Sequence, residues 1–221
     1  MAITATLSNH FKFNVFDNKI DFGADAIQVA LARSGFVFDK DIHAKYDHFS
    51  GTTGTIGTIS FTATDKINDS ANGLGIFVVG QKVTVTTTSG LNDGTYTVTV
   101  VAAGQLTVSE TTIATEAAGA AGNSDVTGAD EIQTAFGYTL TGITAAGGAL
   151  AEDDTNDRAE YTCNTITWTA AGGSIGPSPG AFIYDDTDAD KTVIGYLDFG
   201  SEQTATTGNT FSIANIAVRL A

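Results

Sequence analysis

Two clusters of carboxylates are the residues of this sequence best suited to bind a ligand. The first is the segment DDTDAD, with Asp185, Asp186, Asp188 and Asp190. The second is the segment EDDTND, with Glu152, Asp153, Asp154 and Asp157. Calcium takes six to eight oxygen ligands, so Asp186, Asp188 and Asp190 are candidate Ca²⁺ ligands. An EF-hand loop starting at Asp186 would need Gly and Glu where Lys191 and Leu197 stand, so a solvated turn is the favoured interpretation.

Histidine and cysteine offer little for nucleophilic or metal chemistry. His43 and His48 lie five residues apart, without the i, i+4 spacing that places two imidazoles on one helix face, so we expect a solvated or interface loop there. His10 falls in a predicted helix, and Cys163 falls in a predicted strand, where a thiol is usually a small hydrophobe. A nucleophile elbow and a phosphate-binding P-loop are both missing from the sequence. We therefore predict a protein that is not an enzyme and uses no cofactor.

The charge balance excludes another class of function. The 221 residues include 10 Lys and Arg against 25 Asp and Glu, for a net charge of −15. Because nucleic-acid affinity comes mainly from Lys and Arg at phosphates, we expect no nucleic-acid partner. The N-terminus lacks the features of a signal peptide, and no stretch approaches the roughly 18 apolar residues of a membrane helix, so we expect no membrane partner.

The composition of the sequence is that of an all-β protein, so strands and turns must position the carboxylates, histidines and cysteine. Threonine and valine are abundant, and 25 Gly against 2 Pro supply turns between short strands. We expect a β-sandwich or barrel with one short N-terminal helix at residues 8–20, capped by Ser8 or Asn9. After the helix, Ile27, Val29 and Leu31 alternate as the inward side of a strand.

A change of composition predicts two domains. Residues 51–125 contain only two basic residues, and they read as a small barrel-like β-domain inserted into a loop of an outer domain made of residues 1–50 and 126–221. Within the insert, the segments QKVTVTTT and TYTVTVV predict a hairpin with its valines facing each other, Val83 and Val85 against Val98 and Val100. The segment LGIFVVG is of strand size, and residues 114–125 read as a return strand or linker. In the outer domain FGYTLTGI, residues 136–143, is one of several expected short strands.

The outer domain resembles a family of small virion structural proteins of tailed bacteriophages, the head decoration or accessory proteins. The matching segments are Asn156 to Ala159 before the strand of Trp168, then a closing series formed by Ile183 to Asp186, Ile194 to Tyr196, Asp198 to Gly200 and Gly208–Asn209. Within the insert, residues 79–110, VGQKVTVTTTSGLNDGTYTVTVVAAGQLTVSE, resemble a β-module that recurs in phage structural proteins. The insertion at residues 51–125 departs from the family pattern, which is shorter.

The resemblance implies a non-enzymatic virion component assembled in the host cytoplasm. It implies a capsid decoration or cement protein, with the major capsid protein or other virion proteins as partners. It also implies a homo-oligomer, a trimer being favoured. The outer domain would bind the shell, with the inserted domain projecting.

Three alternatives remain open at the level of sequence. One is a tail or neck position in the same virion, and a second is a tail fibre or adhesin that binds host-surface glycans. The third is a polymer hydrolase, which would need paired carboxylates in an aromatic-lined cleft. Trp168 lies in a predicted core strand, which disfavours it as a sugar-stacking residue.

Overall fold

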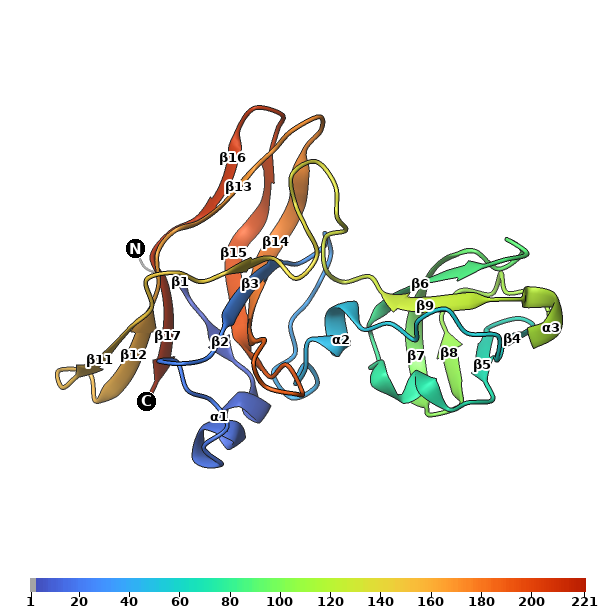
Figure 1. Cartoon of the computed structure of the whole chain (residues 1–221), viewed down its shortest axis with the longest axis horizontal. Coiled ribbons are helices and arrows are strands. Elements are labelled where there is room, and N and C mark those ends of the chain that lie inside the picture. Colours follow the sequence, from blue (N-terminus) through green and yellow to red (C-terminus); the bar gives the residue numbers. More distant parts are fainter. Residues whose placement is uncertain (1–2) are drawn as a thin grey trace. The chain divides into compact units, whose positions relative to one another are not determined.

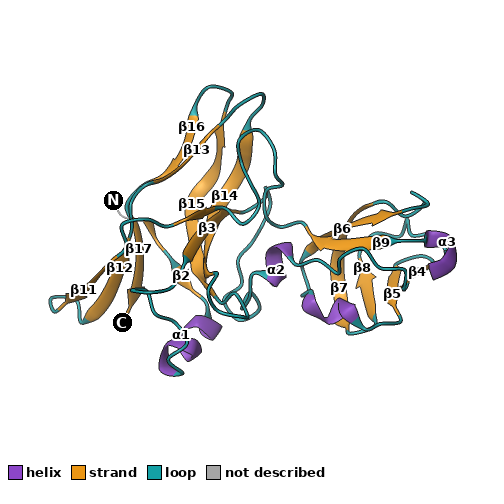
Figure 2. Ribbon diagram, viewed as in Figure 1, coloured by secondary structure: helices purple, strands orange, loops and turns teal. Residues whose placement is uncertain are grey.

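The computed structural model describes residues 3–221 and divides the chain into two compact units (Figure 1). Unit 1 contains the residues up to Tyr46 and those from Glu131 to Ala221, and unit 2 is Asp47–Asp130. The borders of unit 2 thus lie four residues before and five residues after the expected range 51–125. Strands make up 45% of the chain and the helices are short, so the expected all-β class is confirmed (Figure 2).

The centre of unit 1 is a five-stranded sheet of order β10-β3-β14-β15-β2. Its strands are Ile143–Thr144, Ile27–Leu31, Ile175–Asp185, Val193–Ala205 and Thr6–Leu7. Both faces of the central strand β14 are covered, because the consecutive residues Ala181, Phe182, Ile183 and Tyr184 are all buried. The same holds for β3, where Ala30 is buried along with the predicted inward residues Ile27, Val29 and Leu31.

A second sheet and a separate ribbon complete unit 1. The four-stranded sheet has the order β1-β17-β12-β11, with strands Ile3–Thr4, Ile216–Leu220, Arg158–Thr162 and Ala149–Asp153. The ribbon pairs β13, Ile166–Thr169, with β16, Thr210–Ile213. Trp168 in this ribbon is buried and meets the ring of Phe211 edge-on, with centroids 6.2 Å apart. The aromatic residues of the ribbon therefore belong to the core.

The N-terminal helix α1 is shorter than the sequence predicts. It runs over Asn9–Phe16, and Ser8 rather than Asn9 is its cap, with Ser8 Oγ accepting from the amide of Phe11 at 3.0 Å. The prediction extended the helix to residue 20, but Asn18 has a left-handed backbone with φ of 55° that ends it. Two further helices of four residues each were not predicted, α2 at Asp47–Ser50 and α3 at Ala118–Ala121.

Unit 2 is one curved, antiparallel six-stranded sheet of order β4-β5-β8-β7-β6-β9. Its strands are Ile59–Thr62, Lys66–Asp69, Gln105–Val108, Gly94–Ala102, Lys82–Thr87 and Ser124–Gly128. Isolated bridges continue the pairing beyond both outer strands, Phe61 with Glu116 at β4 and Ile56 with Ser124 at β9. Unit 2 has a hydrophobic core of its own, which includes Ile59, Leu74 and Leu106.

Several local predictions in the two units were wrong. Val83 pairs with Tyr96 and Val85 with Gly94, and a bulge between Val98 and Val100 turns Val100 outward, where it is 54% exposed. The segment LGIFVVG, residues 74–80, begins within a 3-10 helix, Gly73–Ile76, and forms no strand. FGYTLTGI is mainly turns, since Phe136 and Thr141 both have positive φ, and only its last residue enters β10. Residues 114–125, expected to be a return strand or linker, hold the unpredicted helix α3 and then the start of strand β9.

Candidate functional site

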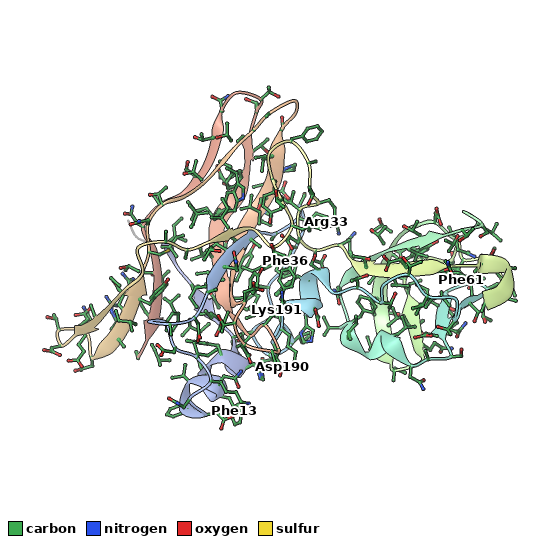
Figure 3. The ribbon with its side chains drawn as sticks, in the orientation of Figure 1. Phe13, Arg33, Phe36, Phe61, Asp190 and Lys191 are labelled. Atoms are coloured by element: carbon green, nitrogen blue, oxygen red, sulfur yellow. The ribbon has the colours of Figure 1, made fainter. Side chains whose placement is uncertain are left out.

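The first carboxylate cluster begins at the last residue of β14 and continues into the loop between β14 and β15, where Figure 3 labels Asp190 and Lys191. Each of its acids has its own partner. Asp186 pairs with Lys191 and Asp190 pairs with Lys45, both at 2.7 Å. Asp188 accepts a hydrogen bond from the hydroxyl of Thr192, which links the loop to the residue just before β15. Among residues 3–221 no group of three or more His, Cys, Asp or Glu is arranged to hold a metal ion. The structure therefore does not bring the candidate ligands Asp186, Asp188 and Asp190 together around one point.

Asp185, at the start of this loop, has a perturbed carboxyl. Its side chain is fully buried, and Oδ1 accepts from the amide of Thr187 at 2.8 Å. Its Oδ2 accepts from no N–H or hydroxyl group among the described residues, and the side chain shares a hydrogen bond with the carboxyl of Asp25. Burial raises the pKa of Asp185 to about 6, and the neighbouring carboxyl of Asp25 contributes to the increase.

The second cluster forms the turn between β11 and β12. Asp153 accepts from the side-chain amide of Asn156 at 2.7 Å and pairs with Arg158 at 2.8 Å, and both contacts lower the pKa of its carboxyl. Farther along β12, Glu160 pairs with Arg219 of β17. These contacts form a row of alternating charges on one face of the four-stranded sheet, in which the carboxylates support the sheet.

The three histidines and the cysteine come from four different places in the fold. His43 is buried, and its Nδ1 accepts from the backbone amide of Asp39 at 2.9 Å, whereas His48 belongs to the other unit. His10 lies on α1 beside Asn14. Cys163 follows the end of β12 instead of lying inside a strand, and burial raises the pKa of its thiol. A raised thiol pKa disfavours the thiolate that a nucleophile requires.

Sequence reasoning missed Glu131, the most connected carboxylate of unit 1. Glu131 is fully buried, and its side chain accepts from the hydroxyls of Tyr46 and Tyr138 and from the amide of Thr141. Tyr46 is the last residue of unit 1 before unit 2, and Glu131 is the first residue after it. The hydrogen bond between them joins the two points where the chain leaves and re-enters unit 1.

Two cavities of unit 1 differ in character. The larger, about 500 Å³, is lined mainly by β15 and β16, with Asp198 as its one carboxylate among the lining residues. The smaller, about 170 Å³, lies between α1 and the apolar face of the four-stranded sheet. Its walls include Phe11, Val15, Leu150 and Tyr161. The smaller cavity is almost wholly apolar, which suits packing against another apolar surface better than binding a polar ligand.

Comparison with known proteins identifies no relative of this chain. No protein-family model, curated protein or solved structure matches it. In the part of the chain that the structure describes, no helix is both long enough and apolar enough to span a membrane.

Proposed function

We propose that this chain is a non-enzymatic structural protein of a tailed-phage virion, positioned on the capsid surface as a decoration or cement protein. Its partners would be the major capsid protein or other virion proteins and further copies of itself. The protein would be assembled in the host cytoplasm and then remain in the virion. In this role the β-rich units would supply rigid surfaces for contacts with neighbouring proteins.

One observation carries the proposal: two of the segments that resemble the phage family, Ile183 to Asp186 and Ile194 to Tyr196, come together in one buried hairpin. Ile183 lies on β14 opposite Gly195 on β15, so the first two segments of the closing series are paired strands. Ile183 and Ile194 are both buried in unit 1. Gly195 is required there, because a Cβ would lie 2.6 Å from the carbonyl oxygen of Thr6. The resemblance thus rests on residues that determine how the central sheet is built.

The contacts of the acidic residues support a scaffold role. Three carboxylates of the two clusters pair with Lys or Arg: Asp153 with Arg158, Asp186 with Lys191 and Asp190 with Lys45. Trp168 lies in the core, so it cannot serve as an exposed platform for stacking sugars. These observations favour a virion building block over the adhesin and hydrolase alternatives.

The test is to locate the protein in particles of the phage that encodes it. Antibodies raised against the full chain would be used for immunogold electron microscopy of purified particles, with mass spectrometry of the same preparation. We expect label distributed over the head. Label confined to the neck or tail would overturn the decoration role but keep the virion assignment, and absence of the protein by mass spectrometry would overturn both.

A further inference from the structure

A third cavity of unit 1 has aromatic and acidic walls. It has a volume of about 410 Å³, and we call it the Tyr196 cavity after its buried lining residue. Tyr196 of β15 is 6% exposed, and the rings of Phe36 and Phe38 lie beside it, with centroids 5.6 and 5.4 Å away. All three rings line the cavity, and both phenylalanines are only half-buried. The cavity therefore offers aromatic surface to a ligand.

The charged residues that line the Tyr196 cavity are both acids, Asp198 and Glu202. Asp198 Oδ1 accepts from the amide of Gly200 at 2.7 Å. Glu202 Oε1 accepts from the amide of Gly35 at 3.1 Å and from the hydroxyl of Ser34. Among the residues that the structure describes, neither carboxylate forms an ion pair, and the second oxygen of each accepts no hydrogen bond. The cavity thus holds two negative charges that no cation of the chain compensates.

The hydroxyl of Tyr196 is a further unused acceptor. It has no hydrogen-bond partner among the described residues. The phenol lies over Gly180 of β14, where a Cβ would come within 2.3 Å of the hydroxyl oxygen, so the glycine makes room for it. Gly180 pairs with Asp198, which places the hydroxyl on the acidic side of the cavity. Burial and the charge of Asp198 raise the pKa of Tyr196, so the phenol stays neutral.

We propose that the Tyr196 cavity binds the guanidinium group of an arginine side chain from a partner protein. A guanidinium stacks flat on aromatic rings, and its five N–H groups donate to carboxylates. Phe36 and Phe38 supply the rings, and the two acids supply the acceptors. Lysine carries a compact charge that lacks the planar stacking surface. A metal ion would need oxygen ligands on all sides, whereas one wall of this cavity is aromatic.

The charge of the chain favours a basic segment of a different protein as the occupant. With a net charge of −15, the chain repels a second copy of itself and attracts a basic partner. Val37, between the two phenylalanines, is 80% exposed and gives the residues next to the arginine an apolar surface to contact. This inference goes beyond the proposed function, and it holds or fails wherever the protein is located in particles.

The test titrates the ¹⁵N-labelled full chain with the blocked tripeptide Ac-Gly-Arg-Gly-NH₂ and follows backbone amides by NMR. The amides of Gly35 and Gly200 are the reporters, because each donates to one of the two acids. We expect saturable shifts of both amides with a Kd on the order of 1 mM. The same peptide with citrulline for arginine keeps the shape without the charge, and it should bind roughly tenfold more weakly. Equal binding of the two peptides, or no saturable shift of either reporter, would overturn the proposal.

Two further ligands distinguish the occupants. The corresponding lysine tripeptide should bind more weakly than the arginine tripeptide, and equal or tighter binding would overturn the assignment to a guanidinium. Free arginine should also bind more weakly, because its own carboxylate is repelled by the two acids. Tighter binding of free arginine would overturn the assignment to a partner protein.

Glu202→Gln tests the acidic wall, because it keeps Oε1 for the amide of Gly35 and removes the charge. Glu202 is chosen because Asp198 also lines the larger cavity. Glu152→Gln, at an exposed position on β11, is the matched control. We expect the affinity for the arginine tripeptide to fall roughly threefold or more in the first variant only. An equal affinity of the two variants would contradict the acidic wall as a binding element.

Phe38→Leu tests the aromatic wall, with Phe13→Leu on α1 as its control, since Phe13 is 61% exposed. Phe38→Leu should weaken binding of the arginine tripeptide, and Phe13→Leu should leave it unchanged. Urea unfolding of each variant shows that the fold is retained. Unchanged binding by a folded Phe38→Leu variant would overturn the stacking of a guanidinium in this cavity.

Discussion

Individual carboxylates in this protein act mainly on the backbone and side chains of their own loops. Asp153 is paired with Arg158 and Asp190 with Lys45, whereas one oxygen of Asp185 accepts from no N–H or hydroxyl group among the described residues. Glu131 satisfies two tyrosine hydroxyls and an amide. The energetic effect of each acid therefore depends on whether its buried oxygens have donors.

The free energy of unfolding should depend on the protonation of Asp185. Its pKa is raised from 3.8 to about 6 in the folded state, so folding favours the protonated acid, and stability falls as pH rises from about 4 to above 6. Asp185→Asn keeps an oxygen for the amide of Thr187 and removes the charge. We expect this variant to raise Tm by roughly 2–6 °C at pH 7.5 and by much less at pH 4.5.

Thermal melts at the two pH values would measure this difference. Asp154→Asn, at an exposed position in the β11–β12 turn, is the control for the loss of one negative charge. A Tm difference of the same size at both pH values for Asp185→Asn would contradict the prediction.

Two buried tyrosines give a matched comparison of hydroxyl groups. The hydroxyl of Tyr138 donates to Glu131 at 2.7 Å and accepts from the amide of Leu31 at 2.9 Å. The hydroxyl of Tyr196 has no hydrogen-bond partner among the described residues. Tyr138→Phe should therefore cost about 1–3 kcal/mol of unfolding free energy in urea titrations, and Tyr196→Phe should cost little. Equal losses for the two variants would contradict this.

At the scale of elements, alternation predicted the strands well but could not predict their register or their ends. The strands β6, β7 and β8 lie where alternating valines and threonines place them. The facing of Val83 and Val98 was wrong because the connection between β6 and β7 sets the hairpin register, which pairs Val83 with Tyr96. The outward turn of Val100 was missed because it depends on a bulge in the pairing of β7 with β8, which alternation within one strand does not reveal. The end of α1 was missed because it depends on the left-handed backbone of Asn18.

Like the strands, the candidate sites could be predicted from the sequence only in part. The interpretation of the 185–190 cluster as a turn follows from closely spaced Asp, Thr and Lys, and the structure places this cluster in the β14–β15 loop. Glu131 could not be found in this way, because Tyr46, one of its partners, lies 85 residues upstream. The Tyr196 cavity was also invisible to sequence reasoning, since its walls come from segments near both ends of the chain.

At the scale of the whole molecule, the two units have separate hydrophobic cores. The core of unit 1 includes Trp168, the chain's single tryptophan, and the core of unit 2 includes Leu106. A large-to-small substitution in one core removes contacts only within that unit. The two cores can therefore be perturbed and observed one at a time.

Leu106→Ala should lower the stability of unit 2 by about 2–5 kcal/mol, because Leu106 is fully buried. Tryptophan fluorescence reports on unit 1, and circular dichroism reports on both units. During urea unfolding we expect the fluorescence midpoint to stay unchanged while the circular dichroism curve gains an earlier transition. An equal shift of both signals would show that the units unfold together.

The hydrogen bond between Tyr46 and Glu131 has a consequence for how such a chain could evolve. It fixes the two ends of an 84-residue insertion, Asp47–Asp130, within unit 1 itself. The entropy of closing a loop grows only slowly with its length, so the size of the inserted segment matters little to the recipient. The position between Tyr46 and Glu131 is thus a site where recombination could exchange one module for another without altering the parent fold.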